Sequence, residues 1–556
     1  MNSIVKKLRG RAGLPALNLA AAAGFGVLTL TSQRSIGLTV AAIALVGLGV
    51  RVQDTSYSET TGAQILLACA VLVDYSRATA YRGVAPFVVI GLSISTLTIN
   101  RLLVSLIDRP SIQAVNLPGY VARRATTLSP ATLNVAGLGL IAIIGIGSVG
   151  HARPWTVAVI TLAVLVASAT TALQAVRARH RRRNEDQRLR DAVLEFGPRF
   201  ALHFSTSPNS EHQVAMWYPY LRRIGPPFVI IVRERAALPI VAAMTDVPVL
   251  YCEHESHLER VITPSMTACF YTANGVKNGQ MVRFRQLRHI QLLHGDSDKV
   301  SSYNPFTGIY DRIFVAGQAG IDRYGANDVT IPAQKFDIVG RPQIDGITVS
   351  TSHIRDVEAK VVLYATTWAG SYASPNYCSL PIGEKIVRGL LNAGATVILR
   401  PHPYARRTGE TAAQLVRLEQ ILAGDSARTG RRHLFGEIAS ETMSLFDCVN
   451  AADALVSDIS GVASDWLYSA KPFALTNVRG ADRTAFEAEF PLARAAYVVD
   501  QDASNLDEVL AELLTTDSLA DARLNLRTYY LGDFPTETYA DEFVHTARKY
   551  VMGNKP

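Results

Sequence analysis

The chain has 556 residues, a formal net charge of +8 at pH 7, and hydrophobic residues at 48% of its positions. This length is too great for one ordinary domain and fits about three structural units. The five cysteines form no CxxC pair and no zinc-ligand spacing, which argues against a disulfide framework and indicates free thiols in a reducing compartment.

Long apolar runs occupy the sequence before residue 178. They are residues 14–31, 36–50, 62–73, 86–107, 131–149 and 155–176. A helix that crosses a bilayer needs about 20 mostly apolar residues, and the second and third runs are short or interrupted. Arginine and lysine precede the first run and follow the last, so both flanks are expected in the cytoplasm and the number of crossings is even. The sequence predicts a multi-pass membrane region over residues 1–176 with about six spans, four being the alternative.

Residues 177–190 form a strongly basic segment directly after the last apolar run. One interpretation is a solvated cytoplasmic linker that sets the topology. The other is an amphipathic helix lying against anionic lipid. Because basic residues gather at this boundary, a membrane surface is favoured over nucleic acid as the partner.

From residue 191 short β-type runs alternate with helical periods, which is typical of parallel sheets with right-handed crossovers. The predicted strands are 199–205, 228–232, 247–251, 268–272, 290–293, 312–316, 336–340, 361–365, 396–400, 454–457 and 473–476. So many strands exceed one doubly wound sheet. We therefore expect an α/β architecture with two Rossmann-like domains, residues 191–350 and 351–556, whose strand ends face a common cleft.

Polar residues follow three of these strands directly. Ser460 and Gly461 come after the strand at 454–457 and are typical of a helix start that holds an anion, although an ordinary helix cap without a ligand is the alternative. Arg400 offers a phosphate fork, and His402 stands between two prolines that stop the strand. His294 follows an apolar run and precedes a glycine. A histidine in either setting can instead be structural, donating to a backbone carbonyl.

No metal-ligand pattern supports these residues. His254, Glu255 and His257 are close in sequence but match no helical H-E-x-x-H site, and neither a P-loop nor a G-x-S-x-G elbow is present. We expect neither a metal nor a cofactor.

Four segments in this order resemble the CDP-glycerol glycerophosphotransferase family, the teichoic-acid primases and polymerases. They are His294–Lys299, Tyr364–Trp368, Arg400–Pro403, and Asp458–Trp466 followed by Lys471-Pro472. The resemblance covers roughly residues 270–480 and excludes the membrane region. The chain departs from the family pattern at Asp296-Ser297, where the family has Thr-Pro, and at Gly461, where the family has a second serine.

The resemblance implies a GT-B architecture, a CDP-linked polyol donor and two functional histidines. It makes His294 and His402 the expected catalytic residues, either of which could be the base. It places the donor on the second domain and the acceptor on the first. It also assigns contacts with the donor or its phosphates to six residues. These residues are Arg400, Thr367, Asp458, Ser460, Gly461 and Lys299.

The expected activity is transfer of a glycerol-phosphate or related polyol-phosphate unit from a CDP-alcohol such as CDP-glycerol to a hydroxyl of a lipid-linked or cell-envelope glycan acceptor, with release of CMP. The enzyme would be anchored in the plasma membrane with its catalytic region in the cytoplasm. Alternatives are a GT-B glycosyltransferase that uses a nucleotide sugar, and a nucleotide-binding membrane transporter or sensor. No partner among nucleic acids is expected.

Overall fold

The computed structural model describes residues 13–51, 57–79, 83–107, 112–122, 130–206, 209–295, 298, 300–369, 376–406 and 409–553. The chain divides into two compact units. One comprises residues up to Ile112 together with Tyr120–Asp191, and the other comprises Gln113–Gly119 together with Ala192–Pro556.

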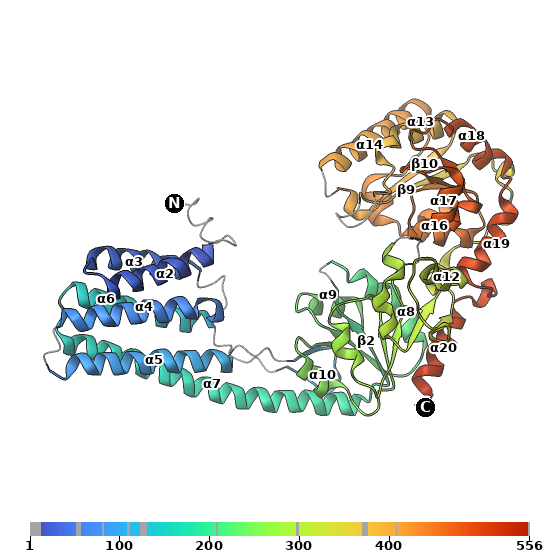
Figure 1. Cartoon of the computed structure of the whole chain (residues 1–556). Helices are drawn as coiled ribbons and strands as arrows, with labels where there is room; N and C mark the ends of the chain where they lie inside the picture. The colour runs from blue at the N-terminus through green and yellow to red at the C-terminus, as the bar shows by residue number, and fades with distance from the viewer. Residues whose placement is uncertain are drawn as a thin grey trace. The chain divides into compact units, whose positions relative to one another are not determined.

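The first unit is helical, and each of the six apolar runs predicted from the sequence lies in one of its helices (Figure 1). These helices are α2 (Gly13–Leu30), α3 (Arg34–Arg51), α4 (Tyr57–Ala78), α5 (Ala85–Ile107), α6 (Pro130–Val149) and α7 (Pro154–Phe196). Among the described residues, only α7 is both long and apolar enough to cross a membrane. Four of the others contain shorter apolar stretches, so the multi-pass arrangement stays a prediction.

A buried carboxylate joins three helices of this unit. Asp74 receives two hydrogen bonds from the guanidinium of Arg34, at 2.7 and 3.1 Å, and a third from the hydroxyl of Ser148 at 2.5 Å. Because a buried charge is tolerated only when it is paired, this cluster fixes the ends of α3, α4 and α6 to one another.

The basic segment 177–190 continues α7 as regular helix as far as Phe196. The segment contains no proline or glycine that would end a helix. The carboxylate of Glu185 pairs with the guanidinium of Arg188, one turn further on, at 2.9 Å.

The second unit contains two sheets, which confirms the predicted α/β, GT-B-like pair of Rossmann-like domains. The first sheet has the strand order β1-β4-β3-β2-β5-β6-β7-β8, parallel except for β1. Its strands are β1 (Gln113–Val115), β2 (Phe200–Phe204), β3 (Phe228–Val232), β4 (Val249–Tyr251), β5 (Ala268–Tyr271), β6 (Arg288–Gln291), β7 (Arg312–Val315) and β8 (Phe336–Ile338). Its helices are α8 (His212–Arg223), α9 (Ala237–Met244), α10 (Glu255–Val261), α11 (Asn278–Val282) and α12 (Gln318–Ala326).

Strand β1 comes from the segment between α5 and α6 and was not predicted. It pairs antiparallel with β4 at the edge of the sheet, with Ala114 opposite Leu250. Asn116 adds hydrogen bonds from its amide to the carbonyls of Ala242 and Thr245, at 3.3 and 3.0 Å. An edge strand exposes unpaired backbone groups, so β1 covers an edge that β4 would otherwise leave open.

The second sheet is entirely parallel, in the order β10-β9-β11-β12-β13. Its strands are β9 (Val361–Thr366), β10 (Thr396–Pro401), β11 (Ala454–Ser457), β12 (Phe473–Thr476) and β13 (Tyr497–Val499). Its helices are α13 (Gly383–Asn392), α14 (Gly409–Thr429), α15 (Leu445–Ala451), α16 (Gly461–Trp466), α17 (Arg483–Glu489) and α18 (Leu506–Ala511). Along β9, Leu363 and Ala365 enter one buried cluster whereas Val362 and Tyr364 enter another, so both faces of the sheet are covered.

The end of the chain returns to the first sheet. Helix α19 (Ala520–Leu531) packs on the second half and on α12, and α20 (Asp541–Met552) packs on α8 of the first half (Figure 1). Phe543 of α20 lies in the first core, 5.1 Å from Trp217 between ring centroids. The first half is therefore completed by residues from the far end of the sequence.

The two crossings between the halves meet at Tyr539. Its hydroxyl donates to the carbonyl of Leu531 at 2.7 Å and accepts from the backbone N–H of Arg341 at 3.0 Å. Gly340 and Gly532, one in each crossing, have φ angles of +72° and +80°, which favour glycine, and both pack against Phe534.

Candidate functional site

His294 is presented by a fixed turn after β6. The side-chain oxygen of Gln291 accepts hydrogen bonds from the backbone N–H groups of Leu292 and Leu293, at 3.0 and 3.1 Å. Its amide donates to Asn274 at 2.7 Å. The N–H of Leu292 also keeps its strand partner, the carbonyl of Tyr271 at 2.8 Å, so the Gln291 side chain mainly serves the N–H of Leu293, where β6 ends.

Leu293 adopts a backbone conformation that is rare for a branched residue, with φ at +59°. Its carbonyl accepts a 2.7 Å hydrogen bond from the indole nitrogen of Trp217 on α8. Non-glycine residues in this region cost about 1–3 kcal/mol and persist only where surrounding contacts impose them. The Trp217 contact is such a constraint, and it fixes the direction in which the next residue, His294, leaves the strand.

The ring of His294 has a defined proton arrangement. Its Nδ1 lies 2.9 Å from the carbonyl of Thr272 and must donate to it, since a carbonyl only accepts. The neutral ring then carries a lone pair on Nε2. Enclosure by protein atoms lowers the pKa of His294 below 6.5, positive Arg341 adds to this, and the bond to Thr272 opposes it. The imidazole is therefore neutral at pH 7 while its side chain keeps an exposed face.

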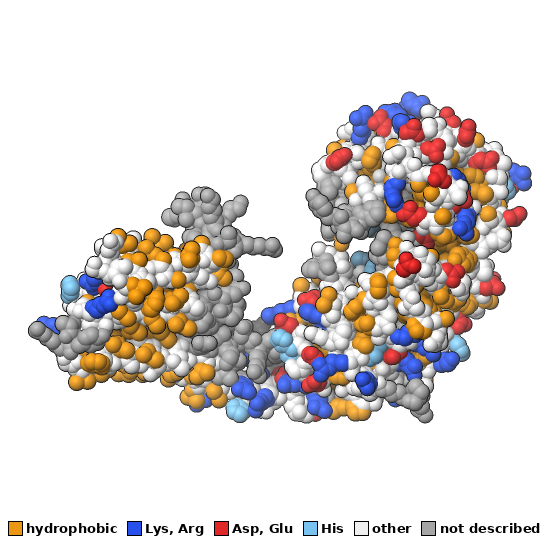
Figure 2. Space-filling model, viewed as in Figure 1, with side chains coloured by type: hydrophobic (Ala, Val, Ile, Leu, Met, Phe, Trp, Pro, Cys, Tyr) orange, Lys and Arg blue, Asp and Glu red, His pale blue; other side chains and the backbone are white. Residues whose placement is uncertain are grey.

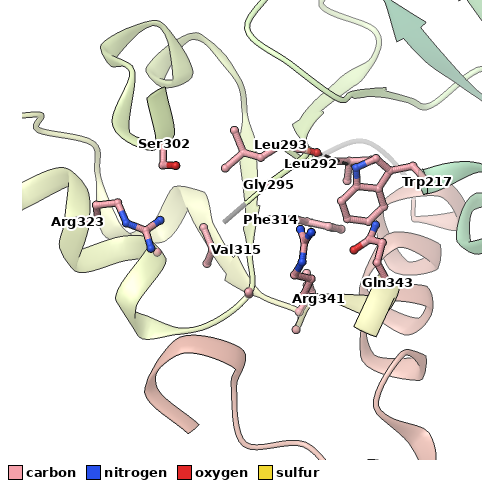
Figure 3. Close-up of a pocket in the computed structure, with 14 residues that line it drawn as sticks. Trp217, Leu292, Leu293, Gly295, Ser302, Phe314, Val315, Arg323, Arg341 and Gln343 are labelled. Atoms are coloured by element: carbon pink, nitrogen blue, oxygen red, sulfur yellow. Dashed lines mark hydrogen bonds between the residues drawn. The ribbon is translucent and has the colours of Figure 1, made fainter. Parts of the chain in front are cut away.

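A small cavity of about 30 Å³, open to solvent at one side, lies beside this turn (Figure 3). Leu293 and Gly295, the two neighbours of His294, line it, as do Trp217, Arg341 and Gln343. Most of these residues follow the carboxyl ends of parallel strands, the edge at which open α/β sheets bind ligands.

Residues of the two halves also contact each other near this cavity. Arg341, which follows β8, forms a buried ion pair with Asp465 of α16 in the second half, with one N–O distance of 3.1 Å. Burial and the negative charge of Glu489 raise the pKa of both Tyr303, in the loop after His294, and Tyr377, in the second half. Tyr303 and Tyr377, one from each half, are therefore influenced by the same carboxylate.

His402 lies at the end of β10 and has the opposite proton arrangement. Its Nδ1 accepts a hydrogen bond from the backbone N–H of Tyr404 at 3.1 Å, so a neutral ring carries its proton on Nε2. Its own backbone N–H donates to Thr366 at the end of β9. The half-buried ring packs against Tyr404 at 5.1 Å and near Trp368 at 6.3 Å between centroids.

The guanidinium of Arg400 is not free at this strand end to bind a phosphate. Its guanidinium donates to the backbone carbonyls of Ala439 and Met443, the latter at 2.8 Å, and approaches the sulfur of Cys448. Arg400 and His402 are two positions apart, but the strand stops between them, so their side chains are free to diverge. In this structure Arg400 fixes the 438–443 segment beneath the sheet.

Asp458 is fully buried and serves the loops around it. One oxygen accepts from the backbone N–H groups of Thr367 and Ser379, at 2.7 and 3.2 Å, and the other from the hydroxyl of Thr476 at 2.8 Å. Burial raises the pKa of Asp458 to about 6 despite these bonds. Thr367 and Asp458 thus hold one another, and both have little exposure to a ligand at this edge.

Ser460 and Gly461 begin α16, as the sequence predicts, with Ser460 in an extended conformation at the N-cap. The Ser460 hydroxyl lies 3.3 Å from that of Ser457 and makes no side-chain cap bond. The helix has six residues, so its dipole is small. Lys299 lies outside the described residues.

The sequence reasoning missed Trp217, Arg341 and Gln343. Trp217 lies inside a helix and carries no local signal. Arg341 and Gln343 follow β8 in the same way that His294 follows β6, so the rule that identified His294 also applied to them. Among the described residues no group of three or more His, Cys, Asp or Glu side chains could hold a metal ion.

One family model matches part of the chain. Residues 333–478 match the family model for CDP-Glycerol:Poly(glycerophosphate) glycerophosphotransferase. This range holds β9 to β12, His402 and Asp458, whereas His294 lies before it. No curated protein matches the chain.

Several solved structures are similar to the second unit. They include the wall teichoic acid polymerase TagF (12% identical, TM-score 0.40, covering 67% of this chain and 95% of that one), a glycosyltransferase from Rickettsia africae (9%, 0.40, 64% and 99%) and S. aureus MnaA with UDP (14%, 0.42, 64% and 98%). All three TM-scores lie below 0.5, so the fold assignment depends on the two sheets described above. Residues 333–478 are thus similar to the CDP-glycerol glycerophosphotransferase family.

Proposed function

We propose that this protein transfers a glycerol-phosphate, or a related polyol-phosphate, from a CDP-alcohol to a hydroxyl of a lipid-linked or cell-envelope glycan acceptor and releases CMP. The observation that carries the proposal is the opposite hydrogen bonding of the two histidines. Nδ1 of His294 donates to a carbonyl, and Nδ1 of His402 accepts from a backbone N–H.

This difference supports one division of the two roles that the sequence leaves interchangeable. His294, with a lone pair on Nε2 and a lowered pKa, is suited to accept a proton at neutral pH. His402, with its proton on Nε2, is suited to donate a hydrogen bond to a phosphate oxygen.

The reaction is an in-line displacement at the β-phosphorus. The acceptor hydroxyl gives its proton to Nε2 of His294 while its oxygen bonds to phosphorus. The bond from that phosphorus to the bridging oxygen breaks, and CMP leaves with the bonding electrons. His402 offsets the charge that develops on the transferred phosphoryl oxygens.

The donor belongs to the carboxyl edge of the second sheet. Three neighbouring strands, β10, β9 and β11, end there, and Asp458 ties the loops after β9, β11 and β12 together. This rigid edge supports a diphosphate near Ser460 and Gly461, which remain the expected contacts. The bound guanidinium of Arg400 supports the loops of this site more than the phosphates.

The helical unit supports a place at the membrane. Helix α7 is apolar in its first half and basic from Arg177, which is the pattern of a span with a cytoplasmic end. We infer a multi-pass plasma-membrane protein whose catalytic region meets a soluble donor and a lipid-linked acceptor on the same side.

The test uses membranes that contain the full chain, radiolabelled CDP-glycerol or CDP-ribitol, and nucleotide sugars as rival donors. We expect CMP release and a phosphate in the product linkage only with the CDP-alcohols. His294→Ala and His402→Ala should each lower turnover at least about a hundredfold. His254→Ala, an exposed histidine that caps no helix through its side chain, is the control and should match the wild type.

Sugar transfer without phosphate in the linkage would replace this proposal with the glycosyltransferase alternative. Near-wild-type CMP release by the His294→Ala or His402→Ala variant would remove that residue from the mechanism.

A further inference from the structure

Gln343 is a buried side chain whose hydrogen-bonding capacity is unused. It is 5% exposed, yet neither its amide nitrogen nor its carbonyl oxygen has a hydrogen-bond partner among the residues that the structure describes. Buried polar groups in folded proteins are nearly always paired, so an unpaired carboxamide needs an explanation outside the described residues.

The carboxamide faces the cavity beside His294. Figure 3 shows its end pointing toward the ring of Trp217, with the guanidinium of Arg341 alongside. Trp217, Leu292 and Phe314 supply apolar walls to the same cavity. An aromatic ring with a carboxamide at its edge is suited to a group that has C–H faces and hydroxyl edges.

The arginine side chains that line the cavity are paired with carboxylates of this chain. Arg341 is paired with Asp465, and Arg323 contacts Asp298 at 3.1 and 3.2 Å. Asp298 also accepts from Tyr530 at 2.7 Å. Because both lining arginines are engaged with carboxylates, the described residues of the cavity offer no uncompensated positive charge to a phosphate.

We propose that this cavity is the subsite for the hydroxyl-bearing end of the acceptor, and that Gln343 recognises a neutral polyol or sugar unit there. A carboxamide presents one acceptor and two donor positions, which complements a hydroxyl that both donates and accepts. The inference rests on the proposed function and adds to it the chemical class of the acceptor's terminal unit.

The position of the cavity connects it to the reaction. The neighbours of His294 on both sides line it, and Arg341 influences the pKa of His294. A polyol held by one hydroxyl on Gln343 would keep another hydroxyl near the base. Gln343 is then a binding residue for the acceptor, and it takes no part in proton transfer.

The experiment measures CMP release from CDP-glycerol by the full-length protein with glycerol and methyl glucoside as soluble acceptor probes. We expect either probe to stimulate release by the wild type. Gln343→Met keeps an unbranched side chain of similar length but removes both polar atoms. It should raise the half-saturating acceptor concentration at least about tenfold and leave the KM for CDP-glycerol unchanged.

The control is Gln318→Leu, at an exposed glutamine on α12 that bonds only its neighbour Asp322 among the contacts of the described residues. It should behave as the wild type. The Tm of Gln343→Met should be equal to or above that of the wild type, because an unpaired buried amide is removed.

Two results would overturn the inference. One is an unchanged acceptor dependence in Gln343→Met, which indicates that water alone fills the cavity. The other is the absence of any stimulation of the wild type by both probes while CMP release in native membranes persists. Absence of CMP release from every CDP-alcohol would instead overturn the proposed function itself.

Discussion

The indole nitrogen of Trp217 donates to the carbonyl of Leu293 at 2.7 Å, one residue before His294. It holds Leu293 at a φ of +59°, which an isolated leucine rarely adopts. A residue of α8 thus sets the position of the proposed base without touching a reacting atom.

Replacing Trp217 with phenylalanine should lower kcat about tenfold, because it removes one hydrogen bond while retaining an aromatic wall. The KM for the acceptor should change less than kcat, and circular dichroism should show an intact fold. Tyr218→Phe, which removes a hydrogen bond to Asp246 on the exposed side of the same helix, is the matched control. Equal losses in both variants would indicate a general weakening of α8.

The rate should depend on pH through His294. A base must be unprotonated, so kcat/KM should fall as the pH drops below the pKa of His294. Enclosure by protein lowers that pKa, which places the acid limb below pH 6.5 and leaves the rate flat above it up to the next titration. An acid limb above 6.5 in the pH profile would contradict the assignment of His294 as the base.

Asp458 should make the protein less stable as the pH rises. Its folded pKa, about 6, is above its usual 3.8, so the native state binds the proton more tightly than the unfolded state. This contribution is complete below pH 3.8 and is lost as the pH rises through about 6, on the order of 3 kcal/mol in total. In calorimetry, the Tm of Asp458→Asn should rise relative to that of the wild type as the pH is increased from 4.5 to 7.5. A constant difference in Tm across this range would show that Asp458 does not titrate there.

The Arg341–Asp465 pair should be costly to break on one side. Asp465→Ala leaves a buried guanidinium without its carboxylate, and such losses cost about 3–5 kcal/mol. Arg341→Ala should cost a similar amount, and the double variant less than the sum of the two. Urea unfolding of all four proteins measures this coupling, and strict additivity would mean that the pair contributes nothing as a pair.

Strand β1 should be required for a well-behaved catalytic fragment. Residues 192–553 alone leave the outer edge of β4 without a partner, and exposed edges promote association. Light scattering should show that this fragment aggregates more than one with residues 112–119 fused to it. The fused segment with Asn116→Ala, which loses the bonds to Ala242 and Thr245, should give an intermediate result.

Much of the fold follows from local pattern. The apolar run 228–232 forms β3 with the predicted bounds, and the strands 454–457 and 473–476 are likewise observed as predicted. Strand β6 ends two residues before its apolar run does, because Leu293 leaves the extended conformation and its N–H bonds the side chain of Gln291. Strand β1 carries no signal, since its three residues are extended only through pairing with a distant strand.

The site was only partly predictable for a similar reason. A polar residue after an apolar strand identifies which side chains reach the carboxyl edge, and this was sufficient for His294 and His402. It does not fix where a long side chain turns, so the engagement of Arg400 with Ala439 and Met443 could not be read from its neighbours. The burial of Asp458 depends on the segment between β9 and α13 and on the end of β12, which meet only in the folded chain.

The junction at Tyr539 has a mechanical consequence. Two crossings connect the halves, and they touch through the hydroxyl of one tyrosine, with Gly340 and Gly532 both packed against Phe534. Two connections that lie side by side act as a hinge between the halves. They allow the halves to rotate about one axis and resist twisting or sliding. Closure over a substrate would then bring the same two strand edges together on every turnover.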